Sequence, residues 1–137
     1  MPGPPCRQES CSSCPYRRDV PSGVWARSTY EILRPFDLPT AEQPMGPFAC
    51  HATPDHLCHG WVVVSDRRGR ENNEYASLAL RLWPIANIPP ERAPLWGSHT
   101  EAADHGQRDC DNPSLEAMNM AHRLVDKYDR LRWGDQP

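Results

Sequence analysis

The chain has 137 residues and a net charge of −3, so it is most simply one domain with no overall attraction to nucleic acid. Its mean hydropathy of −0.75 and its 16 prolines argue against a large core, long uninterrupted helices or a wide regular sheet. The longest strongly apolar run, residues 61–64, is too short to cross a bilayer.

The N-terminal third predicts little regular structure. Residues 1–10 are expected to form a flexible tail, and residues 11–133 a single domain. Ser28 and Glu31 have the spacing of a capping box, which predicts a short helix over residues 29–34.

The middle of the chain predicts one strand and one helix. Residues 60–64 read Gly-Trp-Val-Val-Val, a β-branched run that favours a short strand, although a helical turn also fits it. Residues 75–83 predict a helix that ends before Pro84, and a proline-rich linker follows over residues 84–94.

The C-terminal third predicts two helices. Ser98 and Glu101 form a second capping box, and Gly106 is expected to end that helix in a left-handed conformation. Asn112 and Pro113 then open a long amphipathic helix over residues 114–132. Its predicted apolar stripe consists of Met118, Ala121, Leu124, Val125, Tyr128 and Leu131.

Four cysteines have a spacing that predicts a metal site. Cys11 and Cys14 form one Cys-x-x-Cys pair, and Cys50 and Cys58 form a second, wider pair. Because the N-terminus lacks the pattern of an export signal, a cytoplasmic location is expected, where thiols bind metals or stay free. The four thiolates predict a structural Zn²⁺, with a 4Fe-4S cluster as the alternative, since Pro15 after Cys14 resembles a ferredoxin motif.

Two histidines adjoin this cysteine set. His51 and His59 each follow a predicted ligand directly, so they are expected to donate to a thiolate or a carbonyl, or to replace a cysteine as ligand. Cys6 and Cys110 lie outside the set.

A second group of residues predicts contact with a partner. Arg17 and Arg18 follow the first cysteine pair, and Tyr16 or Trp25 is suited to stacking on a base. The alternative is that carboxylates such as Asp19 neutralise these arginines on a solvated face.

Catalysis has weaker support in the sequence. Glu101, Asp104 and His105 crowd one short segment, but a capped polar helix explains them equally well. The sequence has no phosphate-binding loop, nucleophile elbow or His-Glu-x-x-His motif, so an enzyme is not expected.

The first block, residues 11–25, resembles a family of small uncharacterised proteins of actinobacteria and their phages. Members open with Cys-x-x-Cys-Pro-aromatic-Arg-Arg-Asp, as residues 11–19 do here. Residues 48–51 with 58–61, residues 76–82 and residues 101–114 are similar to later blocks of that family. The resemblance implies the four-cysteine set and, because the family is of unknown function, no activity.

Together these patterns predict a small, irregular, α-rich α+β domain stapled by a metal ion and closed by the long C-terminal helix. The function that they favour is a non-catalytic zinc-binding adaptor for a protein or nucleic-acid partner. The alternative is an iron–sulfur protein with a redox or sensing role.

Overall fold

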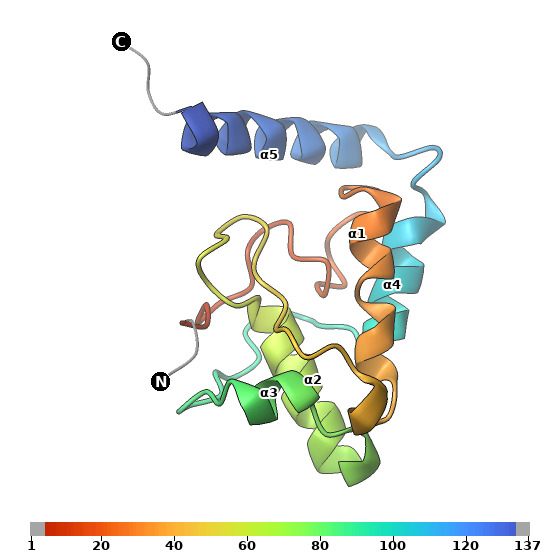
Figure 1. Ribbon diagram of the computed structural model, residues 1–137. Helices are drawn as coiled ribbons and strands as arrows, with labels where there is room; N and C mark the ends of the chain where they lie inside the picture. The colour runs from red at the N-terminus through yellow and green to blue at the C-terminus, as the bar shows by residue number, and fades with distance from the viewer. Residues whose placement is uncertain (1–4, 134–137) are drawn as a thin grey trace.

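The computed structural model describes the backbone of residues 5–133 and the side chains of residues 5–126 (Figure 1). The fold is a small, helix-rich single domain. Its helical elements are α1 (Arg27–Glu31), η1 (Arg34–Asp37), η2 (Thr40–Glu42), α2 (His59–Glu71), η3 (Asn73–Tyr75), α3 (Leu78–Leu82), α4 (His99–Arg108) and α5 (Leu115–Trp133). None of the described helices is both long and apolar enough to cross a membrane.

The predicted strand at residues 60–64 is wrong, because these residues form the first turns of α2. Every residue from 59 to 65 is buried, so all sides of the first two turns of this helix are packed against other parts of the protein. Burial on all sides lets tertiary packing outweigh the β-propensity of the three valines. At the centre, Trp61 is fully buried and its ring meets that of Phe36 at 5.4 Å between centroids.

The β part of the predicted α+β fold is reduced to isolated bridges in residues 5–133. One joins Cys6 to Leu57 and a second joins Leu57 to Ala49. The backbone N–H of Leu57 also donates to the carbonyl of Pro5 at 2.7 Å. Residues 5–7 of the expected tail are therefore paired with the domain, whereas residues 1–4 lie outside the described part of the chain.

The capping box predicted at Ser28 is also wrong, whereas the one at Ser98 is confirmed. Helix α1 begins after Ala26 with no side-chain cap, and the Glu31 carboxylate accepts hydrogen bonds from Arg34 instead. At the start of α4, Ser98 Oγ accepts from the backbone N–H of Glu101 at 3.1 Å. The predicted helix over residues 75–83 is split into η3 and α3.

Gly106 does not end a helix in a left-handed conformation, as the sequence predicted. It lies inside α4, and an added Cβ at this position would overlap the ring of Tyr30. Helices α1 and α4 lie side by side in Figure 1, and the missing side chain of Gly106 allows their close approach.

Helix α5 runs along one edge of the molecule (Figure 1) and begins at Leu115, with Ser114 Oγ accepting from the N–H of Ala117. The residues that pack against the body agree with the predicted stripe only at Leu124: they are Ala117, Met120 and Leu124, which pack with Val20, Val24 and Trp25. Met118 and Val125 are exposed. The predicted contacts of Tyr128 and Leu131 lie outside the described side chains.

Candidate metal centre

Three separate segments bring the four predicted ligands together. Cys11 and Cys14 lie in the N-terminal loop, Cys50 lies in the loop before α2, and Cys58 is the residue that caps the N-terminus of α2. All four thiols are free, and Cys14 Sγ lies 3.7 Å from Cys58 Sγ. The thiol of Cys11 interacts with those of Cys14 and Cys50. The contacts therefore form a chain that runs from Cys50 through Cys11 and Cys14 to Cys58.

This chain of contacts approaches the geometry of a tetrahedral metal site. A Zn–S distance of about 2.3 Å places two thiolate sulfurs about 3.8 Å apart, close to the separation of Cys14 and Cys58. Within residues 5–133, however, no group of three or more Cys, His, Asp or Glu side chains is already arranged to hold an ion. Among the other three thiols, only that of Cys11 affects the pKa of Cys50, so Cys50 must move closer to Cys14 and Cys58 to complete the tetrahedron.

Backbone amides favour the thiolate form of two of the cysteines. The backbone amide of Tyr16 lowers the pKa of the Cys14 thiol, and the backbone amides of Thr53 and Ala52 lower that of the Cys50 thiol. They do so because an N–H donor stabilises the thiolate. Tight turns after a cysteine are therefore placed to support bound thiolates.

The close approach of the thiols and their burial have the opposite net effect, because they raise the pKa values of these cysteines. Contact with Cys14 raises the pKa of Cys11, and contact with Cys11 raises the pKa of Cys50. For Cys14, the contact with Cys11 lowers the pKa, but the contact with Cys58 and burial outweigh it and raise the pKa well above its usual range. Cys11, Cys14 and Cys50 therefore keep their protons at pH 7, and a divalent cation would have to displace these protons on binding.

The two predicted accessory histidines are oriented differently. The His51 ring lies 5.1 Å from that of Trp25 and 5.2 Å from that of Phe48, and burial against these rings lowers its pKa. His59 is buried, and its Nδ1 donates to the backbone carbonyl of Arg7 at 3.1 Å. His59 therefore supports the N-terminal segment, which carries the first cysteine pair.

The residues predicted to bind a partner do not form one surface. Tyr16 is fully buried, so it cannot stack on a base. Arg17 makes two hydrogen bonds with Asp19, at 2.8 and 2.7 Å, as the alternative interpretation had it. Arg18 lies over the ring of Trp96, and the indole N–H of Trp25 donates to the carbonyl of Ser13.

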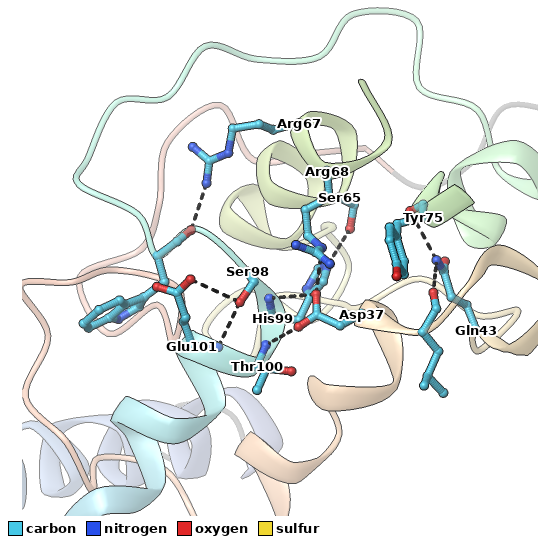
Figure 2. A network of polar contacts seen from close by, with 12 residues as sticks. Asp37, Gln43, Ser65, Arg67, Arg68, Tyr75, Ser98, His99, Thr100 and Glu101 are labelled. Carbon is cyan, nitrogen blue, oxygen red and sulfur yellow. Dashed lines mark hydrogen bonds and ion pairs between the residues drawn. The ribbon is translucent and has the colours of Figure 1, made fainter. Parts of the chain in front are cut away.

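Sequence reasoning missed a buried polar network around His99, and Figure 2 shows its contacts with Ser65 and Asp37. Tyr16 Oη lies 2.6 Å from His99 Nδ1, and Ser65 Oγ lies 3.3 Å from His99 Nε2. Burial lowers the pKa of His99 to about 4 and raises that of Tyr16 well above its usual range. Both groups are therefore neutral at pH 7, so one ring nitrogen of His99 donates a hydrogen bond and the other accepts one.

Asp37 joins this network to two helices (Figure 2). Its carboxylate accepts from the backbone N–H of His99 at 3.2 Å and of Thr100 at 2.6 Å, at the N-terminus of α4. It also pairs with Arg68 Nε of α2 at 2.8 Å. The positive end of α4 and the guanidinium both favour the charged carboxylate, so Asp37 fixes α2 and α4 relative to each other.

The buried His99 predicts a pH-dependent stability. Its folded pKa of about 4 lies below the unfolded value of 6.5, so its contribution is complete above pH 6.5 and is lost as the pH falls toward 4. The free energy of unfolding should fall by up to about 1.4 kcal/mol per pH unit in this window. His99→Gln should flatten the profile, as measured by urea unfolding of both proteins; parallel profiles would contradict the assignment.

The polar cluster of α4 is dispersed among structural contacts. Glu101 belongs to the capping box, Asp104 pairs with Arg34 at 2.8 Å, and His105 Nε2 lies 2.7 Å from the carbonyl of Val20. These side chains do not converge on a common point at which acid–base chemistry would take place.

Comparison with known families matches residues 6–120 to DUF6283, a family of unknown function. The chain is a DUF6283 protein. The match includes all six cysteines of the chain, so Cys6 and Cys110, which lie outside the predicted ligand set, are within the DUF6283 domain. No curated protein and no solved structure matches the chain.

Proposed function

We propose that the DUF6283 domain binds one Zn²⁺ through Cys11, Cys14, Cys50 and Cys58, and that the ion holds the domain together. The observation that supports this proposal is a chain of neighbouring free thiols from three segments, in which Cys14 Sγ lies 3.7 Å from Cys58 Sγ. Four thiolates fill a tetrahedral zinc ion and leave no position for a substrate, which is typical of a structural site. Such a site requires the reducing conditions of the cytoplasm.

The spacing of the sulfurs supports a single ion over a 4Fe-4S cluster. In a cluster, each cysteine binds a different iron, so the sulfurs surround the cluster rather than one atom. The 3.7 Å between Cys14 and Cys58 is the separation expected of two ligands on the same ion.

For the adaptor role, a protein is the partner that the surface supports. Helix α5 leaves three large apolar side chains exposed, Leu115 by 70%, Met118 by 43% and Val125 by 58%. Grouped apolar residues on a surface are typical of a protein interface. By contrast, three arginines that could attract a nucleic acid are paired with carboxylates. Arg17 pairs with Asp19, Arg67 pairs with Glu91, and Arg70 pairs with Asp66.

Metal analysis of purified variants tests the proposed site. The protein should carry one zinc per chain, as measured by inductively coupled plasma mass spectrometry, and Cys14→Ser or Cys58→Ser should lose it. Cys6→Ser and Cys110→Ser are matched controls that should retain it. Neither control thiol interacts with the four: burial alone raises the pKa of Cys6 to about 11, and Cys110 donates to backbone carbonyls. Zinc retained in Cys58→Ser would contradict the ligand set.

A further inference from the structure

A cavity of about 340 Å³ lies between the first cysteine loop and helix α5. Its walls come from the N-terminal segment (Arg7 and Ser10 to Ser13), from Ala52, and from Met120, Arg123 and Leu124 of α5. A volume of this size is at the small end of the range for small-molecule sites. The cavity is distinct from the metal centre, and Cys11 is the residue that they share.

The charge of this cavity is positive and is not neutralised by its own walls. Two arginines line it, and none of its lining residues carries a carboxylate. Arg7 is positioned by neutral acceptors, with Nη1 donating to Thr53 Oγ1 at 2.6 Å and Nε to the carbonyl of Glu9 at 3.1 Å. Among the described residues, neither Arg7 nor Arg123 forms an ion pair with a carboxylate.

The cavity also has hydroxyl groups suited to an oxyanion. Ser10, Ser12 and Ser13 all line it. The Ser10 hydroxyl is buried and has no hydrogen-bond partner among the described protein atoms. A tetrahedral oxyanion in the cavity would accept from both guanidinium groups and from the serine hydroxyls that line it.

We propose that this cavity binds the phosphate group of a small phosphate monoester. The two arginines would hold the phosphate oxygens, the serine hydroxyls would donate to them, and Met120 and Leu124 would contact the apolar part of the ligand. A nucleic acid is disfavoured, because Arg17 and Arg67 outside the cavity are paired with carboxylates and Arg18 lies over the ring of Trp96. The cavity holds two arginines, which suits one phosphate rather than a row of them.

Isothermal titration of the zinc-loaded protein with inorganic phosphate and with glycerol phosphate tests this assignment. Glycerol phosphate should bind at one site with a dissociation constant of about 1 mM or tighter. Arg123→Gln should weaken that binding about tenfold, because it removes a charged donor. Arg81→Gln is the matched control: it makes the same charge change at an exposed residue of α3 and should bind as the unmodified protein does.

Three results would overturn the proposal. They are the absence of saturable binding of either phosphate, equal binding by Arg123→Gln and Arg81→Gln, and tighter binding of a single-stranded oligonucleotide than of glycerol phosphate. Zinc content, measured on the same samples, should be unchanged in Arg123→Gln. The failure of the phosphate site is therefore distinguishable from the failure of the metal site.

Discussion

Removal of the metal by a chelator is expected to unfold most of the domain. Structural zinc contributes about 10–16 kcal/mol of apparent binding free energy, which is comparable to the whole net stability of a small domain. Closing the loop between Cys14 and Cys50 costs only about 3 kcal/mol, so the ion more than offsets it. Without the ion, the crowded thiols are no longer held together, and Cys58 no longer fixes the start of α2 to the N-terminal loop.

Far-UV circular dichroism under reducing conditions measures this effect. The chelated protein should lose most of its helical signal, and added Zn²⁺ should restore it. The reductant is essential, because oxidation of neighbouring thiols would otherwise trap the apo-protein. A metal-free sample whose spectrum equals that of the metal-bound protein would show that the ion is dispensable for folding.

Gly60→Ala is expected to give the largest loss of stability among conservative substitutions at the metal centre. An added Cβ would lie 2.5 Å from Tyr16 Cβ and 3.0 Å from Cys14 Sγ. Neither atom can move freely, because Tyr16 is fully buried and bonded to His99, and Cys14 is a proposed ligand. We expect a loss of about 3 kcal/mol or more, at the upper end of what overpacked cores show.

Gly46→Ala provides the matched control for this substitution. Gly46 is an exposed loop residue, and an added Cβ there meets no atom within 4 Å. Urea unfolding should therefore give Gly46→Ala the stability of the unmodified protein, while Gly60→Ala unfolds at a lower concentration and retains less zinc. Equal urea midpoints for the two variants would show that α2 does not pack closely against the cysteine loop at Gly60.

Local sequence signals predicted only part of the fold, since the same capping-box spacing failed at Ser28 and was correct at Ser98. The capping box at Ser98 depends on residues three positions apart, and it is confirmed. The strand predicted at residues 60–64 failed because burial on every side of α2 comes from segments distant in the chain. The prediction that Gly106 ends the helix was wrong for the same reason. The glycine is needed because the ring of Tyr30, which is distant in the chain, packs directly against it.

The candidate site shows a similar division. The spacing of the four cysteines singled them out, and the structure brings their thiols into a chain of contacts, although they are not yet arranged around an ion. The network of Tyr16, His99 and Ser65 had no local signal, because its members come from three distant segments. The sequence also could not show which aromatic residues are exposed. Tyr16 is of a type that can stack on a base, but its ring is buried in the core.

X-ray absorption at the zinc edge tests the central claim most directly, because it counts and identifies the ligands of the bound ion. The ligand set proposed here predicts four sulfur neighbours at about 2.3 Å and no nitrogen or oxygen neighbour. A first shell with fewer than four sulfurs, or a purified protein that contains iron and no zinc, would contradict it.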